Sequence, residues 1–165
     1  MQADSRTGEK REAAIDDKNV VLRYQENQKK KIEHTSIALR DADIVDAGFD
    51  NFVRARWDEL ANGKVIPVSF ASIAHQKVLP LRISVKPLDK CVQNPADKTS
   101  QAQFCIWVDI DNVFLRMVLG NIKLTYDQQH RLQKFDGIVN LQSDSQDNQN
   151  AVIHYFYSAD YSTVE

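Results

Sequence analysis

The chain has 165 residues, 42% of them hydrophobic, a length that fits one domain whose core needs no metal or disulfide to hold it together. Its 21 lysines and arginines nearly balance 23 acidic residues, so the net charge of −2 provides no field that would attract nucleic acid, anionic lipid or a polyanionic substrate. The longest near-apolar run, residues 113–119, is interrupted by Arg116 and is too short to cross a bilayer, so we expect no transmembrane segment.

Residues 1–18 are polar, charged and poor in aromatic side chains. This composition predicts a flexible lead-in, followed by a single folded domain over residues 19–158 and a tail over residues 159–165. The same segment contains no export signal, which would have a basic stretch followed by an apolar one. Two alternatives follow: a cytosolic protein, or a mature or trimmed chain whose signal lay upstream.

The first elements of the domain are two predicted strands, residues 20–25 and 31–39, in which apolar side chains alternate with polar ones around the polar turn 26–29. The strongest local pattern follows, because apolar side chains recur at helical spacing and predict one amphipathic helix over residues 47–62. Asp46 or Asp50 is expected to cap its start, and Gly63 to end it. The apolar positions are Phe49, Phe52, Val53, Trp57 and Leu60.

After the helix the apolar period changes to two and predicts strands over residues 65–70, 79–85, 104–110, 122–126 and 132–138. The run 151–157 is apolar on both faces apart from His154, which predicts a strand inside the sheet and a histidine in the core. The polar tract 142–150 is expected to be an exposed loop. The predicted fold class is therefore α+β, a curved antiparallel sheet of about seven to eight strands with one main amphipathic helix packed on one face.

The two cysteines, Cys91 and Cys105, flank a polar stretch that is typical of a long hairpin loop, where antiparallel strands can hold them side by side. A disulfide there would close a loop of about 15 residues and persist only in an oxidising compartment. The alternative is two unconnected thiols. We expect the disulfide.

Catalytic or metal-binding patterns are weak. Asp109 and Asp111 lie two apart on a strand and point the same way, which permits a shared cation, but the pattern is equally typical of a solvated strand end, the interpretation we prefer. The four histidines have no partner at metal-ligand spacing, and no phosphate-binding glycine loop or nucleophile elbow occurs. We therefore expect no catalytic residue, no metal site and no cofactor.

Two segments carry a resemblance to a known family: Asp-Ala-Gly-Phe-Asp at residues 46–50, with Trp57 and Gly63, and Leu-Thr-Tyr-Asp at residues 124–127, with Gly137 and Asn140. They resemble an uncharacterised family of exported proteins of Gram-negative bacteria, over roughly residues 8–157. The resemblance implies a periplasmic or secreted location and attaches no activity. The family is more distantly similar to the curved antiparallel sheets of periplasmic lipoprotein carriers, which hold acyl chains on a concave face.

Two functions remain open. The first is a non-enzymatic envelope protein that binds a lipid or other apolar ligand between sheet and helix, because a single helix is predicted to cover the sheet and residues 113–119 are rich in apolar side chains. The second is a protein-interaction module that uses a sheet face or edge, with another protein or a second copy as partner. The predicted ligand-binding residues are Phe49, Phe52, Trp57, Phe114 and Met117.

Overall fold

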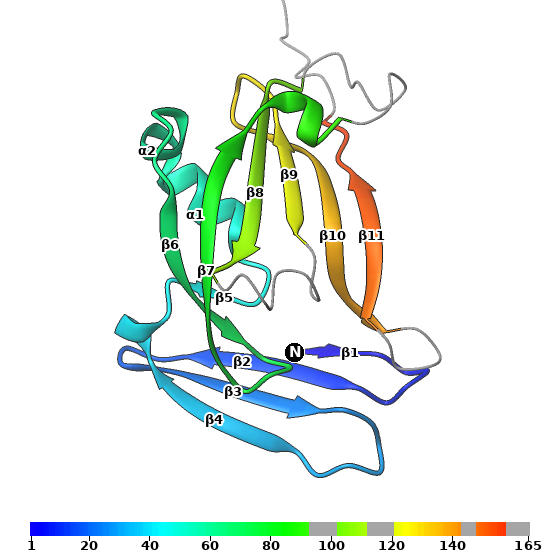
Figure 1. Ribbon diagram of the computed structural model, residues 1–165. Coiled ribbons are helices and arrows are strands. Elements are labelled where there is room, and N and C mark those ends of the chain that lie inside the picture. Colours follow the sequence, from blue (N-terminus) through cyan, green and yellow to red (C-terminus); the bar gives the residue numbers. More distant parts are fainter. Residues whose placement is uncertain (93–101, 112–120, 143–147, 158–165) are drawn as a thin grey trace, which may run out of the picture.

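The computed structural model describes residues 1–92, 102–111, 121–142 and 148–157. Within these ranges the chain forms a four-stranded sheet of order β1-β2-β3-β4 and a seven-stranded sheet of order β11-β10-β9-β8-β7-β6-β5. Figure 1 shows the strands of the small sheet running across one end of the large sheet. The α+β class and the curved seven-stranded sheet are confirmed.

The small sheet comprises β1 (Gln2–Ala3), β2 (Lys10–Ile15), β3 (Asn19–Gln25) and β4 (Glu33–Ala38). The β3–β4 hairpin was predicted, but the flexible lead-in over residues 1–18 is wrong because β2 pairs with β3 along its whole length. Polarity misled the prediction: Glu9 and Arg11 are 4% and 6% exposed, yet they satisfy each other in an ion pair.

A hydrophobic cluster, separate from the main core of the large sheet, joins the two sheets. One face of β3 and β4 packs against the end of β6 (Ile66–Ser72) and the turn that follows it, which leads into β7 (Lys77–Lys86). The β6–β7 hairpin belongs to the large sheet and so ends in the hydrophobic layer of the small one. The buried members of this cluster are Val20, Leu22, Ile37, Ala71 and Ile73.

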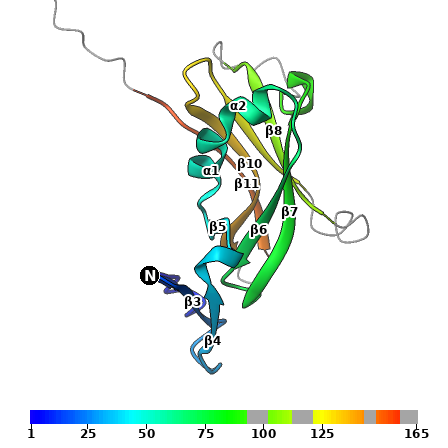
Figure 2. The same cartoon turned by 90° about the vertical axis from the view of Figure 1, so that its left-hand side faces the viewer.

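The large sheet continues through β8 (Phe104–Ile110), β9 (Ile122–Tyr126), β10 (Leu132–Gln142) and β11 (Asn148–His154). It is antiparallel except for β5 (Ile44–Val45), which runs parallel to β6, so the prediction of a wholly antiparallel sheet is wrong at that edge. The register of β10 shifts against both of its neighbours. Such bulges increase the bending of a strand, and the sheet is visibly curved in Figure 2.

The predicted helix over residues 47–62 is two short helices, α1 (Phe49–Ala55) and α2 (Trp57–Ala61), interrupted at Arg56, where φ is −113° and ψ is 21°. Both lie on the concave side of the large sheet (Figure 2). Gly63, at φ 80°, ends α2 as predicted: its N–H donates to the Leu60 carbonyl, and the next N–H to that of Glu59. The predicted aspartate cap is wrong, because Gly48 is the cap residue and no side chain bonds there.

The final strand corrects two predictions. Within the described residues β11 is the edge of the large sheet, and Val152, Phe156 and His154 are exposed where an interior strand and a core histidine were expected. The predicted loop 142–150 is partly strand, since Gln142 pairs with Asn148. Apolar side chains on both faces indicated burial, but one of those faces belongs to the cavity described below.

The predicted disulfide is present. The short 3₁₀ helix η2 (Leu88–Lys90) carries Cys91 back toward β8, where it bonds to Cys105 with an S–S distance of 2.05 Å and a Cα–Cα distance of 5.6 Å. Both cysteines are buried. Cys105 is also the partner of Lys86 in the last pair of the β7–β8 ladder, so the bridge fixes this end of the two strands.

The turn between β9 and β10 is organised by Asp127, whose side chain is 1% exposed. Its carboxylate accepts backbone N–H bonds from Gln129 and Arg131, and side-chain bonds from Arg131 Nε and Gln133 Nε2, each of the latter at 2.8 Å. Burial alone would raise the pKa of Asp127, but these donors hold it below the ordinary value of 3.8.

We expect the double variant Cys91→Ala, Cys105→Ala to lose about 3 kcal/mol of unfolding free energy, because the bridge no longer restricts a loop of about 15 residues in the unfolded chain. Urea unfolding of both proteins measures the difference. Reduced wild type is the matched control and should shift by a similar amount. Equal midpoints for oxidised, reduced and variant protein would show that the bridge does not stabilise the fold.

We expect Asp127→Asn to cost about 1–3 kcal/mol at neutral pH, because the amide loses the charge-assisted bonds from Arg131 and Gln133. In wild type this stabilisation is present above pH 3.8 and is lost as the pH falls through the lower folded-state pKa. Urea unfolding at neutral and acid pH tests both statements. Asp136→Asn is the control, since Asp136 is half-buried and makes one distant pair with Lys123; an equal loss there would contradict a special role for Asp127.

Candidate ligand-binding cavity

A cavity of about 380 Å³ lies on the concave side of the large sheet, between the start of α1 and strands β6–β11. It is partly open to solvent, and one side chain of the small sheet, Arg11, also reaches it. The apolar lining residues are Ala47, Phe49, Phe70, Ile73, Ala74, Leu79, Leu81, Val108, Ile110, Ile122, Leu124, Leu132, Phe135, Ile138, Val139 and Ile153. The others are Arg11, Asp46, Asp50, Ser72, His75 and Tyr155.

The main wall follows from strand periodicity. Three neighbouring strands each contribute residues two positions apart, which point to the same face: Leu79 and Leu81, Val108 and Ile110, and Ile122 and Leu124. On β10 the lining residues Leu132 and Phe135 are three apart, and they share a face because the register shifts between Leu132 and Lys134. A bulge thus keeps the wall continuous where simple alternation would break it.

The helix side of the cavity is closed by aromatic packing. Phe49, the first residue of α1, stacks on Phe70 of β6 with ring centroids 5.2 Å apart and an interplanar angle of 30°. Both rings line the cavity. On the opposite side, Ile153 and Tyr155 complete the wall, although they are 40% and 37% exposed.

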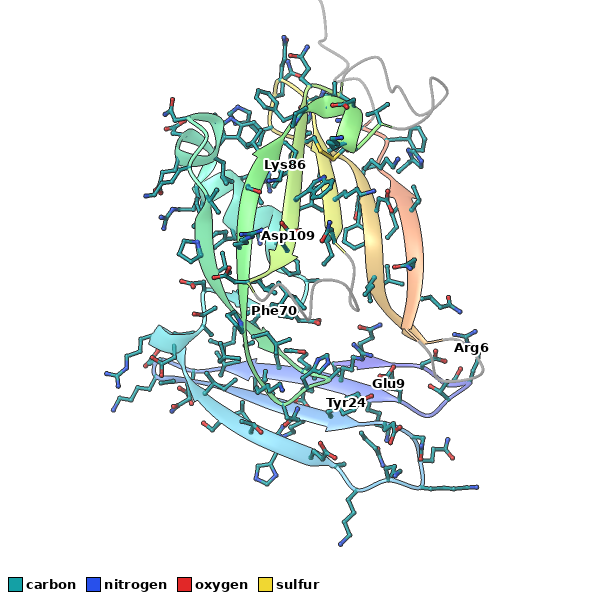
Figure 3. The ribbon with its side chains drawn as sticks, viewed as in Figure 1. Arg6, Glu9, Tyr24, Phe70, Lys86 and Asp109 are labelled. Atoms are coloured by element: carbon teal, nitrogen blue, oxygen red, sulfur yellow. A yellow bond between two sulfur atoms is a disulfide. The ribbon has the colours of Figure 1, made fainter. Side chains whose placement is uncertain are left out.

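A polar group lies where the cavity meets the small sheet. Arg11 donates to Glu9 Oε1 from Nε at 2.9 Å and from Nη2 at 2.6 Å, and its guanidinium lies 5.7 Å from the centroid of the Tyr24 ring. Figure 3 shows Glu9 and Tyr24 on this sheet. The turn after β6 adds Ser72, whose hydroxyl lies 2.8 Å from His75 Nδ1.

His75 is neutral at physiological pH. Partial desolvation of the ring, in a residue that is otherwise exposed, and then the nearby charges of Lys77 and Arg11 lower the pKa of its imidazole below 6.5. The ring has therefore one N–H and one acceptor nitrogen in the folded protein.

Another polar group lies at the start of α1. Asp50 Oδ2 pairs with Arg54 at 3.2 Å, and Oδ1 is a buried oxygen on the side of Asp50 that is not paired with Arg54. The fully buried Tyr126 lies close to it: burial, and then the Asp50 carboxylate, raise the pKa of this phenol above its ordinary value. The phenol is thus a neutral neighbour of the Asp50 carboxylate.

The structure places the five predicted ligand residues differently. Phe49 lines the cavity, while Phe52 is half-buried against the main core and is not among the lining residues. Trp57 is also outside the lining. Its ring centroid lies 4.9 Å from that of Phe104 and 3.9 Å from that of His130, which stacks on it. His130 is a turn residue with a backbone φ of 59°. Phe114 and Met117 lie outside the described residues.

The prediction of a solvated strand end is wrong for Asp109 but confirmed for Asp111. Asp109 is buried and lies 3.7 Å from Arg82 on the neighbouring strand β7, whereas Asp111 is exposed (Figure 3 labels Asp109). The cavity-lining neighbours Val108 and Ile110 are on the other face of β8. No group of three or more metal-ligating side chains occurs in the ranges described above.

Sequence reasoning missed most of the cavity, although its signal was present. Alternation predicts the apolar faces of β7, β8 and β9, but it does not show how little of those faces the two short helices cover. Arg11 and His75 carried no recognisable motif.

Comparisons with protein-family models, with curated proteins and with solved structures found no match. No helix in the described ranges is long and apolar enough to span a membrane.

We expect the imidazole of His75 to titrate below pH 6.5 in folded protein, which two-dimensional NMR of the ring protons measures directly. Because the unfolded chain then binds a proton that the folded chain does not, this histidine makes stability fall as the pH drops below 6.5. His75→Gln should remove that part of the pH dependence. His34→Gln on β4 is the matched control, because both histidines are exposed residues but His34 does not line the cavity. A midpoint at or above 6.5 would contradict the lowered pKa of His75.

Proposed function

We propose that this is a non-enzymatic protein of the bacterial envelope, located in the periplasm or secreted, that binds a lipid or other apolar ligand. The observation that carries the proposal is the cavity of about 380 Å³ with its wall of aliphatic and aromatic side chains. Ligand pockets of proteins are concave, mostly apolar and commonly about 300–1,000 Å³ in volume. The cavity has the size and chemistry of such a pocket.

The burial of an apolar chain in this cavity is energetically favourable. Each buried CH₂ contributes about 0.8 kcal/mol, so an acyl chain of about ten carbons gains on the order of 8 kcal/mol before the costs of association are subtracted. The charged side chains Arg11 and Asp50 are already paired with Glu9 and Arg54. Binding therefore depends on the apolar wall, and the residues that carry it are Phe49, Phe70, Leu81, Val108, Leu124 and Phe135.

The proposed location rests on the disulfide and on the family resemblance of residues 46–63 and 124–140. The Cys91–Cys105 bond is buried and joins two secondary-structure elements. Disulfides of this kind persist in oxidising compartments such as the periplasm or the extracellular space.

A different observation supports a second candidate function, a protein-interaction module that pairs through a sheet edge with another protein or a second copy. The Tyr155 N–H donates to the Gln133 carbonyl of β10, so the alternate backbone groups of Val152 and His154 point away from the sheet. Strand β11 has no Lys, Arg, Asp or Glu over residues 148–157. Charged residues normally protect such edges.

The cavity proposal predicts that Val108→Phe, which adds a ring inside the wall, lowers affinity for a neutral apolar fluorophore such as N-phenyl-1-naphthylamine at least tenfold. Val152→Phe is the matched control, because Val152 is 54% exposed and is not a lining residue. Phe135→Trp, at the half-buried side of the cavity, gives a second filling variant should Val108→Phe not fold. Fluorescence titration measures affinity, and thermal unfolding verifies the fold.

Equal affinities for wild type and two folded cavity variants would contradict binding in the cavity. Native mass spectrometry of the same samples separates the two functions. A monomer that retains the fluorophore or a lipid-sized mass supports the first. A dimer that carries no ligand and binds no fluorophore supports the second.

A further inference from the structure

Arg11 is the unusual residue of the cavity, because it is a charged side chain only 6% exposed in a largely apolar wall. Arginine is seldom buried to this extent unless its donors are used. It comes from β2, so the small sheet contributes a polar end to a cavity that the large sheet otherwise builds. The hydrogen bonds of this guanidinium therefore indicate what the cavity binds.

Those hydrogen bonds leave donors unused. A guanidinium has five N–H donors, and here Nε and Nη2 donate to the same oxygen, Oε1 of Glu9. Nη1 has no hydrogen-bond acceptor among the side chains and carbonyls of the described ranges. Nη1 is not one of the fully buried atoms that lack a partner, so it is accessible, and Arg11 lines the cavity. A ligand in the cavity that carries a hydrogen-bond acceptor can therefore bond to Nη1.

The charges around this end favour a neutral acceptor. Glu9 compensates Arg11, and Arg54 compensates Asp50. Asp46 in the lining and Lys77 near His75 carry opposite charges, and His75 is neutral and bonded to Ser72. A ligand carboxylate would therefore approach without net positive charge to attract it and with Glu9 beside it. A carbonyl oxygen accepts from Nη1 without this repulsion.

We infer that the cavity binds an acyl ester or acyl amide, with the chain against the apolar wall and the carbonyl oxygen accepting a hydrogen bond from Arg11 Nη1. This inference rests on the proposed function and specifies the polar group of the ligand as an ester or an amide. The aliphatic residues of β7–β9 contact the chain, whereas Arg11 distinguishes ligands of equal length.

The test compares three compounds with the same chain, methyl dodecanoate, dodecanoate and dodecane, as competitors of N-phenyl-1-naphthylamine on the full chain, at a pH where the acid is ionised. One hydrogen bond from a charged donor predicts that the ester binds about tenfold more tightly than dodecane. The ester should also bind more tightly than dodecanoate.

Arg11→Lys tests the residue itself, because lysine keeps the ion pair with Glu9 but lacks the second arm of the guanidinium. The variant should lose the preference for ester and keep its affinity for dodecane. Arg23→Lys is the matched control: Arg23 pairs with Glu12 at 3.2 Å on the exposed part of the same sheet, and this change should leave both affinities unaltered.

The outcomes separate the two proposals. Equal binding of ester and dodecane, tighter binding of dodecanoate, or an ester preference that survives in folded Arg11→Lys would overturn the inference and leave apolar binding intact. Failure of all three compounds to displace the fluorophore from wild type would overturn the proposed function as well.

Discussion

The curvature of the large sheet, combined with the small size of the helices that cover it, is the constraint on which the rest of the structure depends. Strands β7–β10 place alternate apolar side chains on one concave face, and α1 and α2 together provide only twelve helical residues to bury it. At one end the cover is tight: Trp57 packs against Phe104, Tyr126 and His130. Toward the small sheet the helices no longer reach across, and the remaining apolar surface becomes the wall of the cavity.

The small sheet limits this cavity at the other end and changes its chemistry. Its own hydrophobic layer is shared with the tip of the β6–β7 hairpin, which brings Ser72 and His75 to the same place as Arg11. A buried ion pair is not by itself a source of stability, because desolvation offsets much of the Coulomb attraction. The Glu9–Arg11 pair is better understood as a way to keep a hydrogen-bonding group inside an otherwise apolar space.

Periodicity predicted the parts of the fold in which one side of an element is solvated. The apolar positions of β3, β7, β8 and β9 and of the helical segment were therefore recognisable, as was the cysteine pair. The errors share a different cause, which is that burial depends on distant partners. Strand β2 is polar but is paired along its length, β11 is apolar but lies at an edge, and the bulge in β10 breaks the alternation that the prediction assumed. Of the three predicted ligand residues within the described ranges, only Phe49 lines the cavity, because helical spacing identifies the buried side of a helix without showing where its cover ends.

The side wall formed by Ile153 and Tyr155 has a kinetic consequence. Both residues belong to a segment that is hydrogen-bonded to β10 on one side and, within the described residues, to no strand on the other. The free energy needed to detach an edge strand is smaller than that of global unfolding, because only one ladder and few buried contacts are lost. A molecule enclosed by such a wall can exchange with solvent by local fraying while the disulfide, the central strands and the helices stay in place. Residence time and thermodynamic stability are then set by different parts of the same sheet, and selection can adjust one without changing the other.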